Sequence, residues 1–134
     1  MTEKQQRILL VEDEDLNRTL VKAVLARAQI QAVREAEVLD AGSLAAARQQ
    51  LRDEDVDLVL LDMNLPDGNG LTLARELATQ GPPPGRHRPA VVAVTASVLP
   101  QDRAAAIEAG CDGFLDKPYA AADLVAVVAD HLPH

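Results

Sequence analysis

The segment that decides the fold is residues 57–70, which read DLVLLDMNLPDGNG. Its first half is the most apolar strand-like run of the chain, and this run ends in an acidic residue, Asp62. Its second half is rich in Pro, Gly and Asn, which favour turns. In an open parallel sheet, ligands bind outside the carboxyl ends of the strands, so a charged residue that ends a buried strand faces a crevice. Asp62 is therefore a candidate site residue.

Other apolar runs of the chain also end in side chains that can bind or react. They are residues 7–11 before Glu12 and Asp13, residues 90–94 before Thr95, and residues 113–115 before Asp116 and Lys117. These runs alternate with longer segments of helical periodicity, a pattern typical of a parallel sheet covered by helices on both faces. We therefore predict an α/β fold in which the strand endings share one edge of the sheet.

Five helices are predicted between the strands from apolar residues at three- and four-residue spacing. They cover residues 15 to beyond 28, 44–52, 70–79, 100–109 and 121–132. Nothing between residues 28 and 35 stops the first helix, so it is either extended or followed by a loop. The second strand, 36–40, has the weakest pattern. Ser43 is expected to cap the second helix, Gly110 to end the fourth, and the proline-rich stretch 81–89 to form a loop.

Length and composition exclude several classes of protein. The chain has 134 residues, a net charge of -8 and a single cysteine, which fits one domain in a reducing compartment. The acidic balance argues against binding to nucleic acid or to an anionic membrane. The N-terminus is too polar for a signal peptide, and no apolar stretch approaches the roughly 20 residues that cross a bilayer. We expect a soluble cytoplasmic protein without nucleic-acid or membrane partners.

The predicted strand endings bring together Glu12, Asp13, Asp62, Thr95 and Lys117. Three carboxylates this close repel one another unless a cation shares them, and hard oxygen ligands suit Mg²⁺. Since Mg²⁺ usually binds phosphate oxygens as well, the cluster indicates a phosphoryl site. Lys117 would supply a point charge, and Thr95 a hydrogen bond, to phosphoryl oxygens. An aspartate can attack a phosphoryl donor to form an acyl phosphate, and Asp62 is the candidate nucleophile.

On these motifs the chain resembles a two-component response-regulator receiver domain over essentially its full length. The matching segments are 10–14 (LVEDE), 57–66 followed by Gly70, 94–96 (VTA) and 114–118 (FLDKP). The resemblance implies a flavodoxin-like, doubly wound (βα)5 fold with a five-stranded parallel sheet of order 2-1-3-4-5. It also implies that residues 1–134 form a single receiver domain without an output domain, similar to the receivers of hybrid histidine kinases or to stand-alone single-domain regulators.

The resemblance further implies roles for individual residues at the site. Asp62 would accept a phosphoryl group from a sensor histidine kinase or a histidine phosphotransfer protein. Asp13 and Asp62 would bind Mg²⁺ together with the main-chain carbonyl of Asn64, and Glu12 would act through water. Lys117 would pair with the phosphoryl group. No other cofactor is expected.

A second set of residues is implied to transmit and time the signal. Thr95 and Phe114 would be the switch residues, and Asn64 and Ser97 would tune how fast the acyl phosphate hydrolyses. The phosphorylated domain would recruit a downstream protein through the face formed by its fourth helix, fifth strand and fifth helix. The resemblance leaves a homodimer open, and it implies a signalling switch rather than an enzyme.

Three alternative functions are weighed against this switch. A receiver-like module that docks without phosphorylation predicts damage to the acidic set or the lysine, which the sequence does not show. A small phosphohydrolase usually has a second acid two residues after its nucleophile, where this chain has Asn64. A flavodoxin-like FMN carrier needs a phosphate-binding loop after the first strand, and none is present. His87, His131 and His134 lack ligand-like spacing and are expected to be solvated.

Overall fold

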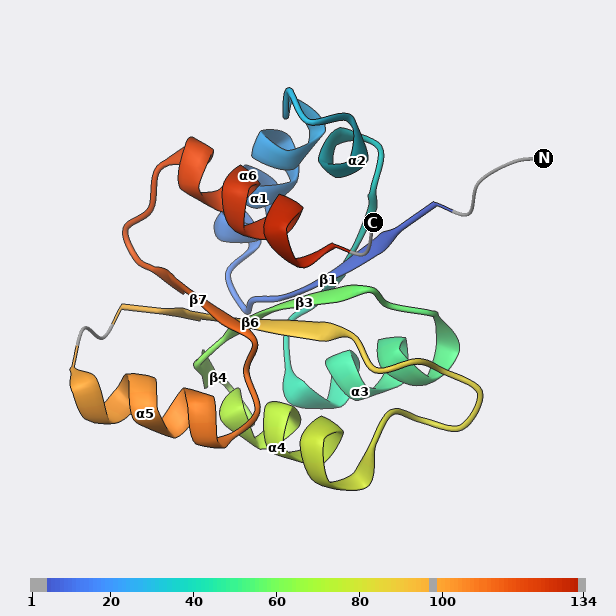
Figure 1. The fold of residues 1–134 in the computed structure, drawn as a ribbon, viewed down its shortest axis with the longest axis vertical. Helices are drawn as coiled ribbons and strands as arrows, with labels where there is room; N and C mark the ends of the chain where they lie inside the picture. The colour runs from blue at the N-terminus through green and yellow to red at the C-terminus, as the bar shows by residue number, and fades with distance from the viewer. Residues whose placement is uncertain (1–4, 97–98, 133–134) are drawn as a thin grey trace.

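A computed structural model of the chain describes residues 5–96 and 99–132. Its main sheet has five parallel strands in the order β2-β1-β3-β6-β7 (Figure 1). The strands are β1 (Arg7–Val11), β2 (Glu37–Ala41), β3 (Leu58–Asp62), β6 (Ala90–Thr95) and β7 (Gly113–Asp116). This confirms the predicted order, because β4 (Asn64–Leu65) and β5 (Gly68–Asn69) form a separate two-stranded hairpin.

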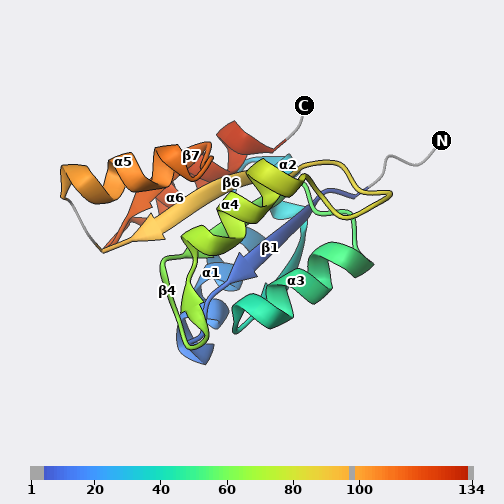
Figure 2. The same ribbon diagram turned by 90° about the horizontal axis from the view of Figure 1, so that it is seen from below.

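Helices cover both faces of the sheet, as the alternating pattern predicts. One face carries α1 (Asp15–Ala26), α2 (Gln31–Arg34) and α6 (Ala121–His131); the other carries α3 (Leu44–Asp53), α4 (Leu71–Gln80) and α5 (Pro100–Glu108) (Figures 1 and 2). Strand β3 is buried at every position. Its residues Leu58 and Leu60 pack in the core beneath α1, α2 and α6. Val59 and Leu61 pack in the core on the opposite side.

The first helix is not extended past residue 28, which was one of the two predicted possibilities. Helix α1 stops at Ala26, and a separate turn of helix, α2, begins after four intervening residues. A straight helix continuing to Glu35 would carry the chain about 13 Å past Ala26. The turn instead brings Val33, which is only 1% exposed, back into the core with Ala28. Burial of these two side chains therefore decides where α1 ends.

Two predicted helix boundaries are confirmed by their local geometry. The Ser43 hydroxyl accepts a hydrogen bond of 3.1 Å from the amide of Ala46 and caps α3. Gly110 follows α5 with φ of +95°, a left-handed conformation that glycine adopts without strain.

None of the helices among the described residues combines the length and the hydropathy that a membrane span requires.

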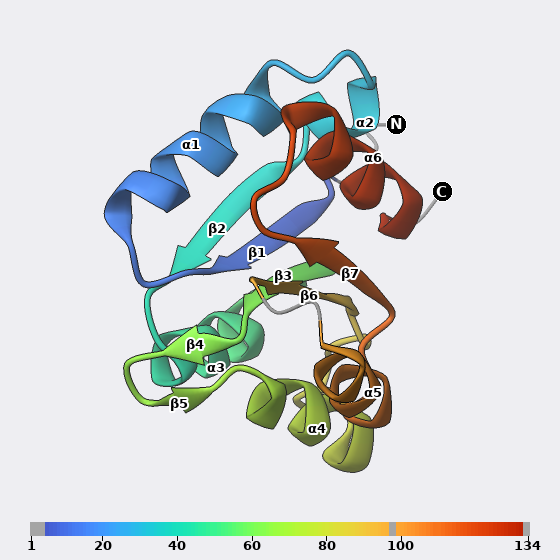
Figure 3. The same cartoon turned by 90° about the vertical axis from the view of Figure 1, so that its left-hand side faces the viewer.

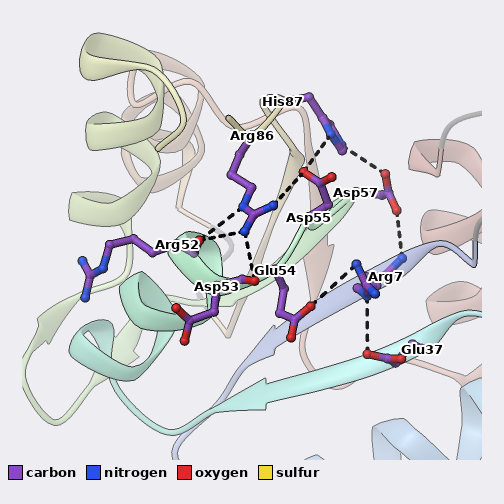
Figure 4. Close-up of polar contacts among 9 residues, drawn as sticks. All are labelled: Arg7, Glu37, Arg52, Asp53, Glu54, Asp55, Asp57, Arg86 and His87. Atoms are coloured by element: carbon purple, nitrogen blue, oxygen red, sulfur yellow. Dashed lines mark hydrogen bonds and ion pairs between the residues drawn. The ribbon is translucent and has the colours of Figure 1, made fainter. Parts of the chain in front are cut away.

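A network of acidic and basic side chains lies at the amino edge of the sheet (Figure 4). We call it the amino-edge network; it consists of Arg7, Glu37, Glu54, Asp55, Asp57, Arg86 and His87. Arg7 lies 3.5 Å from Glu37 and 3.7 Å from Glu54, and its amide donates to Asp57 at 2.8 Å. His87 lies between Asp57 at 3.0 Å and Asp55 at 3.6 Å.

The same network holds the proline-rich loop 81–89 against the domain. The guanidinium of Arg86 donates to the main-chain oxygens of Arg52 and Asp53 at the end of α3 (Figure 4). The expectation that His87 is simply solvated is therefore incomplete. It is wrong for His131, which is partly buried with Nδ1 2.8 Å from the Val127 oxygen, while His134 lies outside the described residues.

Candidate functional site

The predicted site residues lie at the carboxyl edge of the sheet, which faces the viewer in Figure 3. Glu12 and Asp13 follow β1, Asp62 ends β3, Thr95 ends β6 and Lys117 follows β7. Strands β1, β3, β6 and β7 are consecutive neighbours in the sheet, so their ends converge. The structure thus brings together side chains that are up to 105 residues apart along the chain.

The core of the site is a cluster of three carboxylates, which we call the acidic cluster: Glu12, Asp13 and Asp62. One oxygen of each residue lies within 4.8 Å of the others. Glu12 and Asp62 are buried, at 5% and 9% exposure, whereas Asp13 is exposed. Buried carboxylates cost free energy unless a positive charge or hydrogen bonds compensate them. This arrangement therefore favours a bound cation.

Glu12 is fixed in place by the start of α1. Its Oε1 accepts a hydrogen bond of 2.9 Å from the side-chain amide of Asn17, and its Oε2 lies 3.4 Å from the amide of Glu14. Arg18 donates to the main-chain oxygen of Glu12 at 2.6 Å. Sequence reasoning did not assign a role to Asn17 or Arg18. Their positions one turn into the helix that follows the acidic pair were the available signal.

Lys117 links two members of the acidic cluster. Its Nζ lies 3.5 Å from Asp62 Oδ2 and 3.6 Å from Glu12 Oε1. Partial burial opposes the charge on the amine, but attraction by Asp62 and Glu12 outweighs it and raises the pKa of Lys117 above its usual range. The peptide bond that follows, Lys117–Pro118, is cis. The contacts with Asp62 and Glu12 therefore keep the Lys117 amine charged beside the candidate nucleophile.

The loop after Asp62 folds back tightly against the end of β3. The amide of Asn64 donates to Asp62 Oδ1 at 3.2 Å, and the amide of Gly70 donates to the Met63 oxygen at 2.9 Å. A Cβ atom at Gly70 would lie 2.0 Å from the main-chain oxygen of Asp62, closer than any two such atoms can approach. Only glycine fits at this position.

Of the predicted switch and lifetime residues, the structure describes Thr95, Phe114 and Asn64. Thr95 is buried at the end of β6. Phe114 is partly buried on the side of the sheet that carries α5, and the guanidinium of Arg103 lies 5.4 Å from its ring centre. Arg103 also pairs with Asp116. Asn64 lies next to Asp62, whereas Ser97 lies outside the described residues.

An apolar groove opens directly beside the acidic cluster. It has a volume of about 580 Å³ and runs between α1 and the start of α6. Its walls are Leu20 and Val24 of α1 and Tyr119, Ala121 and Leu124 on the other side, with Glu12 and Lys117 also lining it. On the same helix, Leu16 and Leu20 are 68% and 54% exposed. Exposed apolar side chains that rim a polar site indicate a surface for another protein.

The residues present fit a magnesium ion. The acidic cluster supplies hard oxygen atoms from one exposed and two buried carboxylates. Across residues 5–96 and 99–132, Lys117 is the only base within 4.0 Å of these carboxylates. Three negative charges and one positive charge leave a balance that one divalent cation neutralises. In the part of the chain that the structure describes, no sulfur or imidazole ligand joins the cluster, which disfavours zinc.

The chain is similar in sequence to known receiver domains and two-component proteins. The family described as the response regulator receiver domain matches residues 8–129. The chain is 36% identical over 132 residues to the two-component response regulator ORR41 of rice, Oryza sativa subsp. japonica, covering 96% of both chains. It is also 36% identical over 121 residues to the aerobic respiration control sensor protein ArcB of Escherichia coli, covering 90% of this chain but only 14% of that protein.

The solved structures include a receiver domain with a bound metal. The receiver domain of the sensor histidine kinase PA1611 from Pseudomonas aeruginosa, which has a magnesium ion coordinated in its active site cleft, superposes with a TM-score of 0.76. The two chains are 26% identical, and the match covers 96% of this chain and 98% of that one.

Proposed function

This chain belongs to the response regulator receiver domain family, and on that premise we propose that it is a phosphorylation switch of a two-component system. Asp62 would accept a phosphoryl group from a sensor histidine kinase or a histidine phosphotransfer protein. The observation that carries the proposal is the acidic cluster, whose oxygens lie within 4.8 Å of one another beside a single lysine. We propose that the chain serves as the acceptor of this group and is not itself an enzyme.

The transfer step is a displacement at phosphorus. A carboxylate oxygen of Asp62 forms a bond to the phosphorus of a phosphohistidine, the phosphorus–nitrogen bond breaks, and the imidazole leaves with the electron pair. Lys117, 3.5 Å from Asp62 Oδ2, would bind a phosphoryl oxygen, and Thr95 would donate a hydrogen bond to another. Asp13, Asp62 and the Asn64 carbonyl would hold Mg²⁺, with Glu12 acting through water. The bound ion would neutralise charge on the phosphoryl oxygens.

The phosphoryl donor is proposed to dock on the groove between α1 and α6. The groove is continuous with the site, because Glu12 and Lys117 line it together with apolar residues such as Leu20. An amphipathic helix of the donor can place apolar side chains there while its phosphohistidine faces Asp62. Leu20→Asp should therefore slow transfer from a phosphohistidine protein that phosphorylates the wild type. Transfer from acetyl phosphate, which needs no docking surface, should stay unchanged.

The response is proposed to leave the site through the face formed by α5, β7 and α6. Thr95 and Phe114 would be the switch residues there, and a downstream protein or a second copy of the chain would bind this face. Arg103 supports the assignment, because it contacts both the Phe114 ring and Asp116. Asn64 and Ser97 would set the lifetime of the acyl phosphate. We propose a cytoplasmic location.

Intact mass after incubation with acetyl phosphate tests the proposal. Wild type should gain about 80 daltons, the mass of one phosphoryl group, only when Mg²⁺ is present, and Asp62→Asn should gain nothing. Asn is the matched control, since it keeps the size of the side chain and can still accept from the Asn64 amide. Labelling of Asp62→Asn would refute the assignment of the acceptor. The absence of a gain in wild type would favour the phosphorylation-independent interaction module.

A further inference from the structure

The hairpin that follows Asp62 is attached to the first turn of α3 at its tip. Asp67 lies in the two-residue turn between β4 and β5. Its Oδ1 accepts a hydrogen bond of 2.8 Å from the amide of Leu44, and its Oδ2 accepts one of 3.0 Å from the amide of Ala45. Figure 3 shows the hairpin lying beside α3. The Asp67 carboxylate thus joins the hairpin to two residues of α3 that precede it by 23 and 22 positions in the chain.

These contacts satisfy amides that a helix leaves free at its start. The Ser43 hydroxyl accepts from the next amide, that of Ala46, at 3.1 Å. The hydrogen bonds from Leu44 and Ala45 lower the pKa of Asp67, because they stabilise the charged carboxylate. The first turn of α3 therefore has two caps, and only Asp67 comes from outside the local sequence.

The hairpin needs this attachment because it is very short. Each of its strands has two residues, and an isolated hairpin is marginally stable even when it is longer. At its base the Asn64 amide contacts Asp62, and at its tip a Cβ atom on Gly68 would already lie 3.2 Å from Leu44. The hairpin is thus fixed between the end of β3 and the start of α3.

We propose that Asp67 is a positioning residue for phosphoryl transfer. By fixing the hairpin tip to α3, it holds the main chain of Asn64 against Asp62 and against the metal position. The inference rests on the proposed function, and it adds a residue that touches neither the phosphoryl group nor the ion. Residues that orient the immediate ligands of a metal commonly change its affinity by tenfold or more.

Three variants of the full chain separate positioning from simple capping. Asp67→Ala removes both hydrogen bonds to α3, and Asp67→Asn keeps one acceptor oxygen. Ser43→Ala removes the other cap of the same helix turn but leaves the hairpin attached. Each variant is compared with wild type by thermal unfolding, calorimetric titration with Mg²⁺, the rate of phosphorylation by acetyl phosphate, and hydrogen exchange of the Asn64 amide without metal.

Asp67→Ala should bind Mg²⁺ about tenfold more weakly, accept phosphate more slowly and exchange the Asn64 amide faster than wild type. Asp67→Asn should fall between the two. Ser43→Ala should unfold at a lower temperature but keep the wild-type Mg²⁺ affinity, phosphorylation rate and Asn64 exchange.

The inference is overturned if Asp67→Ala, or Asp67→Asn where the alanine variant does not fold, matches Ser43→Ala in Mg²⁺ affinity and Asn64 exchange. A wild type that neither binds Mg²⁺ nor accepts phosphate would instead overturn the proposed function, so the two failures differ.

Discussion

Acidic side chains gather at both edges of the sheet, but their partners differ. At the amino edge, each carboxylate of the amino-edge network lies within 4.0 Å of an arginine or histidine. At the carboxyl edge, one amine, that of Lys117, lies within 4.0 Å of two of the three carboxylates of the acidic cluster, those of Glu12 and Asp62. Each carboxylate at the amino edge thus has a basic side chain beside it, whereas the carboxyl edge offers one amine to three carboxylates, where a cation and a phosphoryl group are proposed to bind.

The loops at the two edges differ in the same way. The loop 63–70 at the carboxyl edge is packed against the end of β3, where a Cβ atom at Gly70 would meet main-chain atoms of Asp62. The loop 81–89 at the amino edge is open around its glycines, since a Cβ atom at Gly81 or Gly85 would meet nothing within 4 Å. Of these two loops, the one beside the proposed site is therefore the more tightly packed.

The largest effect is expected from breaking the packed loop with Gly70→Ala. The added Cβ would overlap the Asp62 oxygen at 2.0 Å, so the main chain must move, at a cost of about 3 kcal/mol. Gly85→Ala is the matched control at the amino edge: its φ of +83° costs about 1 kcal/mol, but no atom is in the way. Chemical denaturation measures both free energies of unfolding. Equal losses would contradict the difference in packing.

The charge difference between the edges is tested next by Lys117→Gln. The amine of Lys117 repels a cation held by Asp13 and Asp62, so its removal should tighten Mg²⁺ binding roughly fivefold. Arg7→Gln removes a positive charge from the amino-edge network and should leave Mg²⁺ affinity unchanged. Titration calorimetry gives both dissociation constants. Weaker binding by Lys117→Gln would show that the amine organises the metal position rather than competing with it.

Much of this comparison could be predicted from the sequence, because strand endings are local features. Apolar runs followed by Glu12, Asp13, Asp62 and Lys117 predict both the sheet and the edge where these residues meet, and the structure confirms the sheet and its order. Because the strands are parallel, their carboxyl ends lie at the same edge of the sheet, and the residues that follow them meet there.

The contacts that the sequence did not predict join distant segments without any periodic pattern. Asp67 reaches α3 across 23 residues, and Arg7 contacts Asp57 across 50. In the sequence, Asp67 is only a turn residue, because Pro-Asp-Gly predicts a turn but not its partner. The end of α1 was also left open, since burial of Val33, rather than a glycine or proline, determines it.

A smaller effect should appear when the metal-free protein is made alkaline. Because the pKa of Lys117 is raised in the folded state, its pairing with Asp62 and Glu12 stabilises the fold fully below the unfolded value, about 10.4, and is lost as pH rises through the folded value. The difference in unfolding free energy between wild type and Lys117→Gln should therefore be constant from about pH 7 to 9 and shrink above about pH 10.5. A difference that grew with pH would mean that the amine does not stabilise the acidic cluster.

The smallest effect is expected at the amino edge from His87→Gln. The side chain of His87 is 49% exposed, and its contacts with Asp57 and Asp55 are ion pairs only while the ring is protonated. Exposed ion pairs contribute at most about 0.5 kcal/mol each, because water and salt screen them. The loss of stability should therefore be near that value at low salt and smaller at about 1 M NaCl. Mg²⁺ affinity should not change, since the ring lies at the opposite edge from the acidic cluster. A changed Mg²⁺ affinity would mean that β3, which begins beside Asp57 and ends at Asp62, transmits strain between its two ends, and the two edges would then form one coupled system.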